Sequence, residues 1–133
     1  MIATVFISPV VEELIFRGVF INRLKLVVPT VYAILISSMI FASLHSFGSI
    51  FSAFIFAVCV SILYLKTENI FVAIFAHFLN NLFAEIIVMA DYNNILFTDN
   101  MIVLIMSLLA ILSLILISVS IVKELNTINN NKS

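Results

Sequence analysis

The sequence predicts an all-α fold, a polytopic transmembrane helix bundle with about five spans. Of its 133 residues, 64% are hydrophobic and only 10% are charged, and the mean hydropathy is +1.30. A soluble domain carries about 25% charged residues, which argues strongly against a soluble protein. Backbone groups inside a bilayer must be hydrogen-bonded within their own segment, so we expect the spans to be helices. The net charge of −1 supplies no basic field for nucleic acid.

Five apolar stretches reach or approach the length of about 20 residues that a membrane span needs. Short polar breaks separate them, and Pro29 marks the first break. The membrane core is expected to cover residues 1–125, followed by a polar cytoplasmic tail at residues 126–133. The expected spans are residues 2–22, 30–48, 50–66, 69–90 and 101–122.

The charged residues outside the spans predict the orientation of the bundle. The side that carries Asp91 and Asp99 has no lysine or arginine in the five-span arrangement. Cytoplasmic loops are enriched in basic residues, so we expect the N-terminus outside and the C-terminus in the cytoplasm. The Ile- and Asn-rich composition is typical of an AT-rich bacterial genome and favours a bacterial plasma membrane. The basic residues that share the opposite side are Arg23, Lys25, Lys66, Lys123 and Lys132.

The first span contains two adjacent carboxylates and an arginine, Glu12, Glu13 and Arg17. Charges at membrane depth are costly and usually mark a functional site. Glu13 and Arg17 are four residues apart, so they can pair along one helical face. Glu12 lies about 100° away around the helix, and its carboxylate remains available as a general base. The alternative is a structural ion-pair network that ties helices together.

The two histidines of the chain lie in later apolar segments. His45 follows Phe41 by about one helical turn, and Phe41 could pack against the wall of a polar site. His77 and Asn81 share one helical face and could both donate hydrogen bonds to a developing oxyanion. Alternatively, His45 is an interfacial residue, and His77 and Asn81 form hydrogen bonds between helices. Glu85, two turns after His77, is expected near the outer interface.

The three patterns E-E-x-x-x-R, F-x-x-x-H and H-x-x-x-N, in this order in separate apolar segments, resemble the motifs of the CPBP family. This family, also called Abi, comprises CAAX-processing and bacteriocin-processing intramembrane proteases and includes the Ras-converting CAAX endopeptidases. The resemblance implies a helical membrane bundle around a polar cavity. It also implies a peptide or a prenylated protein as the substrate, and the lipid bilayer as the surroundings.

Position by position, the resemblance implies a role for each residue of the motifs. Glu12 would activate water with the help of His45, and His77 and Asn81 would stabilise the oxyanion. Glu13, Arg17 and Phe41 would support the site. Members of the family usually carry further hydrophobic helices before the acidic motif. This sequence does not include them, so we expect an N-terminally truncated member that lacks its upstream helices.

The sequence leaves open whether a metal ion takes part. Glu12, His45 and His77 could supply three zinc ligands and leave a fourth position open, as catalytic zinc requires. However, the chain has no H-E-x-x-H pattern, in which two histidines bind from one helical face. We favour activation of water by Glu12 without any required cofactor.

The leading hypothesis is therefore an intramembrane endopeptidase of the CAAX-processing or bacteriocin-processing type. A second hypothesis is a non-catalytic membrane protein that binds a peptide or confers bacteriocin self-immunity through the same cavity. A third is a subunit of a proton-coupled transporter, in which Glu12 and the histidines relay protons.

Overall fold

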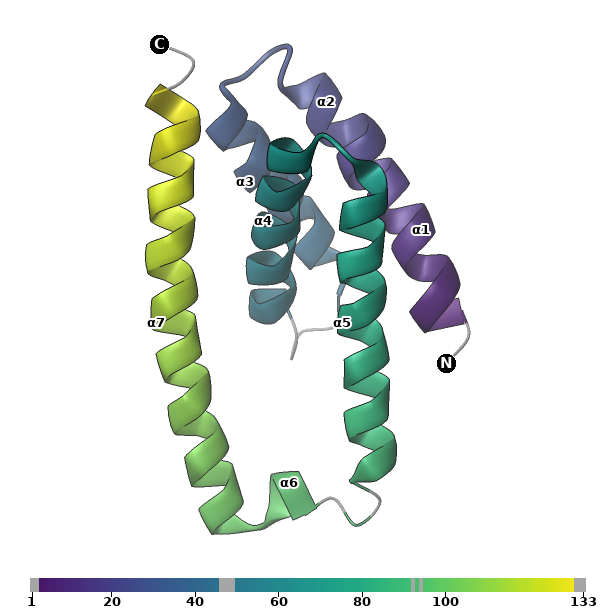
Figure 1. Ribbon diagram of the computed structural model, residues 1–133, viewed down its shortest axis with the longest axis vertical. Helices are drawn as coiled ribbons and strands as arrows, with labels where there is room; N and C mark the ends of the chain where they lie inside the picture. Colours follow the sequence, from purple (N-terminus) through teal and green to yellow (C-terminus); the bar gives the residue numbers. More distant parts are fainter. Residues whose placement is uncertain (1–2, 46–49, 92, 94, 131–133) are drawn as a thin grey trace.

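The computed structural model describes residues 3–45, 50–91, 93 and 95–130, and these residues form helices and no strands. The first four helical segments follow one another directly as a single rod, and the last is a long helix that stands apart along much of its length (Figure 1). The segments are η1 (Ala3–Ile7), α1 (Ser8–Glu13), η2 (Leu14–Phe20), α2 (Ile21–Leu24), α3 (Thr30–Ser43), α4 (Ile50–Thr67), α5 (Ile70–Ala90), α6 (Ile95–Thr98) and α7 (Asn100–Asn130).

The first rod contains two π-helical segments, η1 and η2, on either side of α1. A π-turn is closed by hydrogen bonds between residues five apart, so carbonyl groups lose their usual partners where the helix returns to the α form. The side chain of Asn22 supplies a partner, because its amide nitrogen Nδ2 lies 3.1 Å from the carbonyl oxygen of Arg17 and 3.0 Å from that of Gly18. The same nitrogen lies 2.8 Å from the hydroxyl of Tyr64. Asn22 therefore links the rod to α4.

Two hydrophobic clusters hold the rod, α3 and α4 together. Their buried alanines are small, which allows the helix backbones to approach closely. The first cluster comprises Phe16, Phe41, Ala42, Ala53 and Ala57. The second cluster comprises Ile21, Ala33, Ile34, Val58 and Ile62, with Ile121, Leu125 and Ile128 of α7 packed against it.

Helix α3 is shorter than the expected span at residues 30–48. It has 14 residues and ends at Ser43, so it is about 21 Å long, less than the thickness of a bilayer core. The helix ends because the next two amides, of Leu44 and His45, bond to carbonyl groups three residues back, those of Phe41 and Ala42. The predicted break at residues 46–49 lies outside the described residues.

Among the described residues, three helices are long and apolar enough to cross a membrane: α4, α5 and residues Asn100–Ile128 of α7. The boundaries of α4 and α5 agree with the expected spans at 50–66 and 69–90. Helix α7 continues past the expected end at residue 122 and into the polar tail, as far as Asn130. The extra turns are stabilised because Leu125 and Ile128 pack on the second cluster.

The described basic residues at the ends of the helices, unlike the buried Arg17, gather at one end of the bundle. The end of α2, the turn between α4 and α5, and the end of α7 lie together at the top of Figure 1, and α6 lies at the opposite end. Lys66 of α4 forms a salt bridge of 3.0 Å with Glu124 of α7. Asp91 and Asp99 flank α6. The predicted segregation of charge is thus confirmed for these residues, whereas Lys132 lies outside them.

Replacing Ala33 with leucine tests the close packing of α3 on its neighbours. Ala33 is fully buried in the second cluster, and overpacking of this kind costs about 1–3 kcal/mol. We expect Ala33→Leu to lower the melting temperature of the detergent-solubilised protein. Unfolding can be followed with a thiol-reactive dye, because the single cysteine of the chain, Cys59, is half-buried in α4 and becomes exposed on unfolding. Ala110→Leu on the exposed surface of α7 is the matched control. Equal melting temperatures for the two variants would contradict close packing at Ala33.

Candidate active site

Glu13 and Arg17 form an ion pair that is buried between helices. Arg17 Nη1 donates to Glu13 Oε1 at 2.9 Å, and the side chains are 1% and 0% exposed. Arg17 Nη2 donates to the carbonyl oxygen of Ala57 in α4 at 2.9 Å. The guanidinium carbon also lies 5.1 Å from the centre of the Phe41 ring in α3, a favourable cation–π distance. The predicted pairing of Glu13 with Arg17 is confirmed, and the pair joins the first rod to α3 and α4.

His77 of α5 lies against the same carboxylate. Its Nδ1 is 2.7 Å from Glu13 Oε1, and because a carboxylate accepts hydrogen bonds, Nδ1 is the nitrogen that carries the proton. The imidazole is 4.9 Å from the Phe56 ring and 6.0 Å from the Phe41 ring, both in edge-on geometry. These contacts fix the orientation of the ring. Its second nitrogen, Nε2, is therefore the one left to exchange a proton.

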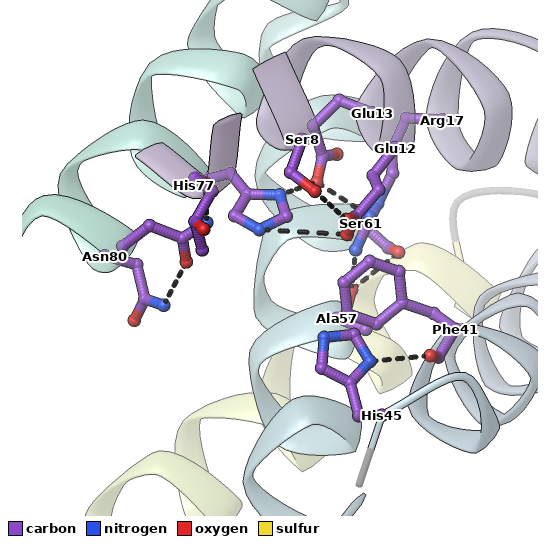
Figure 2. A network of polar contacts seen from close by, with 12 residues as sticks. Ser8, Glu12, Glu13, Arg17, Phe41, His45, Ala57, Ser61, His77 and Asn80 are labelled. Atoms are coloured by element: carbon purple, nitrogen blue, oxygen red, sulfur yellow. Dashed lines mark hydrogen bonds and ion pairs between the residues drawn. The ribbon is translucent and has the colours of Figure 1, made fainter. Parts of the chain in front are cut away.

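Glu12 occupies a different environment from its neighbour Glu13. Its side chain is 30% exposed, and Oε2 lies 4.0 Å from His77 Nε2. That separation is too long for a direct hydrogen bond but suits a group held between the two atoms. Oε1 accepts a hydrogen bond of 2.6 Å from the hydroxyl of Ser8. Figure 2 shows His77 facing both glutamates. The predicted difference between the two carboxylates is confirmed: one is neutralised by arginine, and the other is accessible.

His45 lies at the end of α3, in the turn that closes the helix. Its Nδ1 is 3.0 Å from the carbonyl oxygen of Phe41, and the two rings are 4.7 Å apart. His45 and Phe41 are thus in direct contact. Among the described residues, the imidazole that faces Glu12 is that of His77. The resemblance implied that His45 would assist Glu12.

A cavity of about 230 Å³ brings the second and third motifs together. Both histidines line it, and both have Nδ1 directed at an oxygen that can only accept a hydrogen bond, which leaves each Nε2 with its lone pair. The cavity is lined by Phe41, His45, Ser52, Ala53, Phe56, His77, Asn80 and Asn81.

Asn81 lies on the cavity wall and also links two helices. Its amide nitrogen donates to the carbonyl oxygen of Thr4 in η1 at 2.8 Å. Its oxygen accepts a longer contact of 3.4 Å from the amide of Asn80. One amide hydrogen of Asn81 is therefore used in a hydrogen bond between helices, and the second remains for another acceptor.

Sequence reasoning missed Ser8, Phe56 and the carbonyl of Thr4. Ser8 stands four residues before Glu12, the spacing at which helical side chains meet, so the sequence contained a signal for this contact. The packing of Phe56 on His77 and the bond from Asn81 to Thr4 join residues far apart in the chain. They depend on how the helices dock, and no local pattern reveals them.

The side chains as placed do not form a three-ligand metal centre. Within the described part of the chain, no three His, Cys, Asp or Glu side chains converge closely enough to hold an ion. Anchoring of Nδ1 by an acceptor is common in metal-binding histidines, and it serves equally to orient a histidine for proton transfer. We therefore derive no step of the chemistry through a metal.

Comparison with known families identifies the family of this chain. Residues 1–83 match the Rce1-like family, described as type II CAAX prenyl endopeptidase Rce1-like. The chain belongs to this family. The matched segment contains all three motifs, from Glu12 to Asn81, and ends before α6 and α7. No curated protein and no solved structure matched the chain.

Replacing Arg17 with leucine tests the buried ion pair. The change removes one partner of a fully buried carboxylate, which typically costs about 3–5 kcal/mol. We expect Arg17→Leu to reduce the amount of monodisperse protein recovered in size-exclusion chromatography. Arg23→Leu, at an exposed position in the same rod, is the matched control.

A second change separates the loss of charge pairing from the loss of the arginine side chain. Combining Glu13→Gln with Arg17→Leu removes both charges, so we expect it to recover part of the lost stability. If Arg17→Leu alone behaves like the parent protein, the ion pair does not stabilise the fold.

Proposed function

We propose that this chain is an intramembrane endopeptidase in which Glu12 activates water to hydrolyse a peptide bond. The observation that carries the proposal is the contrast between two adjacent glutamates on either side of one imidazole. Glu13 is completely buried and bound to Arg17 and His77. Glu12 is partly exposed and faces the other nitrogen of His77 at 4.0 Å. Of the two glutamates, only Glu12 is accessible to a water molecule and a substrate.

The proposed reaction begins with water held between Glu12 Oε2 and His77 Nε2. Glu12 takes one proton from this water while the water oxygen attacks the peptide carbonyl carbon, and the carbonyl oxygen becomes an oxyanion. When the tetrahedral intermediate collapses, the carbon–nitrogen bond breaks. Glu12 then returns the proton to the leaving amine nitrogen, so one residue acts first as base and then as acid.

The groups around the cavity would stabilise the developing negative charge. The second amide hydrogen of Asn81 can donate to the oxyanion, and His77 can do so when both of its nitrogens are protonated. The carboxylates of Glu13 and Glu12 flank His77 at 2.7 and 4.0 Å, and they would compensate its positive charge in that form. His45, across the same cavity, is placed to contact the substrate rather than Glu12.

The family supports a peptide substrate that ends in a prenylated CAAX sequence. A leader-bearing bacteriocin precursor is the alternative substrate. The cavity of about 230 Å³ is of a size that would admit an extended segment of peptide rather than a folded domain. The active protein would be an integral protein of a bacterial plasma membrane, with its substrate presented at the bilayer surface.

Glu12→Gln tests the catalytic proposal. Glutamine keeps the shape of the side chain but cannot accept the proton of water. General-base catalysis contributes about 10²- to 10⁴-fold, so we expect a loss of cleavage of that size. The measurement is the cleavage of a prenylated CAAX peptide and of a leader-bearing peptide by protein in proteoliposomes. Glu85→Gln, the same change elsewhere on the bundle, is the matched control and should cleave like the parent.

The two alternative functions give different results in the same preparation. A peptide-binding or immunity protein would not cleave the peptide, and the parent and the Glu12→Gln variant would bind it equally well. A proton-coupled transporter would show pH-dependent flux without cleavage. Cleavage by the Glu12→Gln variant at the parental rate would show that the proposed base is wrong.

Chelation tests the proposal that no metal is required. Because Glu12 and His77 can activate water by themselves, we expect full cleavage after dialysis against a strong chelator. Elemental analysis of the active protein should find less than one equivalent of bound zinc. Loss of cleavage on chelation and its recovery with Zn²⁺ would instead assign Glu12, His45 and His77 as ligands in a rearranged site.

A further inference from the structure

We propose that Ser8 is a positioning residue for Glu12, which holds one carboxylate oxygen so that the other faces His77. The inference rests on the proposed role of Glu12 as the base. Ser8 belongs to none of the three motifs, and its hydroxyl contacts the Glu12 oxygen that does not face the imidazole. The two oxygens of Glu12 are thereby given separate tasks. Oε1 is bound by Ser8 at 2.6 Å, and Oε2 faces His77 Nε2 at 4.0 Å.

The contact between Ser8 and Glu12 has the geometry of a strong hydrogen bond. A donor–acceptor distance of 2.6 Å is within the range of about 2.5–2.7 Å typical of a hydroxyl donating to an ionised carboxylate. Both side chains are half-buried, so water competes less for the bond than at an open surface. Figure 2 shows the hydroxyl of Ser8 pointing at Glu12 within the polar network.

Ser8 differs from other serines in the helices of this protein. The hydroxyls of Ser43, Ser61 and Ser107 donate to backbone carbonyls three or four residues earlier, the usual arrangement for a helical serine. The hydroxyl of Ser8 instead points forward along the helix to a side chain. This unusual direction indicates that the carboxylate, and not the local backbone, determines the orientation of the Ser8 hydroxyl.

The third motif contacts the turn of the first rod that precedes Ser8. The carbonyl four residues before Ser8 is that of Thr4, and it accepts the hydrogen bond from Asn81. Asn81 thus binds the backbone oxygen that a helical serine at position 8 would ordinarily contact. Asn81 of α5 therefore docks on the turn of the first rod that precedes Ser8.

The functional consequence is a fixed direction for the base. The terminal torsion of a glutamate is broad, so an unrestrained carboxylate samples many orientations. A displacement of about 1 Å at a reacting group can reduce a rate about 100-fold. The bond from Ser8 holds Oε2 in the direction of His77 before the substrate arrives.

The kinetic test compares Ser8→Ala, Ser8→Thr and the control Ser107→Ala in the proteoliposome cleavage assay. Because Ser8 acts through Glu12 and does not touch the peptide, we expect Ser8→Ala to lower kcat about 10- to 100-fold and to leave KM unchanged. Threonine retains the hydroxyl and should recover most of the lost rate. The control removes a hydroxyl that contacts only its own helix and should have the parental kcat.

Two kinetic outcomes would overturn the inference. A parental kcat for Ser8→Ala would show that the hydroxyl does not position the base. An equal loss of rate in Ser8→Ala and Ser8→Thr would show that the position matters for packing and not for its hydroxyl.

An infrared measurement tests the contact independently of catalysis. The Glu12 carboxylate band is isolated as the difference between the spectra of the parent and Glu12→Gln. We expect Ser8→Ala to shift this band in the parent and to cause no corresponding shift in a Glu12→Gln background. An unchanged band would overturn the inference even if the protein cleaves peptides. A shifted band in a protein that cleaves no peptide would leave the Ser8–Glu12 contact standing and refute the proposed function.

Discussion

The arrangement of this bundle depends on the buried carboxylate of Glu13. One of its oxygens accepts hydrogen bonds from both Arg17 and His77, and so it ties the first rod to α5. Arg17 extends the connection to α4 through the carbonyl of Ala57 and to α3 through the ring of Phe41. A charge in an apolar interior is tolerated only when partners surround it. The contacts of Glu13 Oε1 and of its partner Arg17 therefore join four parts of the fold.

The burial of Glu13 also explains why the neighbouring Glu12 lies in a different environment. Since Glu13 takes the Nδ1 proton of His77, the imidazole presents Nε2 toward Glu12. Adjacent residues on a helix point about 100° apart, so Glu12 can remain accessible while Glu13 is fully enclosed. A single acidic pair thus provides both the anchor of the bundle and a carboxylate that can reach water. The two glutamates depend on each other, because an imidazole without its bond to Glu13 would not hold its orientation beside Glu12.

Sequence patterns were informative where the interaction lay within one helix. The spacing of Glu13 and Arg17 predicted their ion pair, and the neighbouring position of Glu12 predicted its separate environment. The apolar runs predicted α4 and α5 closely. They overestimated the length of α3, since hydropathy does not detect the tight turn at Leu44 and His45. They underestimated the length of α7, whose last turns are held by tertiary packing. The choice of His77 rather than His45 as the neighbour of Glu12 depends on the docking of α5 against the first rod, which no local spacing encodes.

The two hydrophobic clusters pack against different parts of the bundle. The first cluster contains Phe41 and Ala57, the residues that contact Arg17 directly, so it encloses the polar network. The second cluster receives the end of α7, beside the salt bridge of Lys66 with Glu124. The family match covers the first rod and helices α3, α4 and most of α5, which supply every residue of the polar network, and it ends before α7. Helix α7 therefore supports the basic end of the bundle, while the polar network is confined to the helices that surround Glu13.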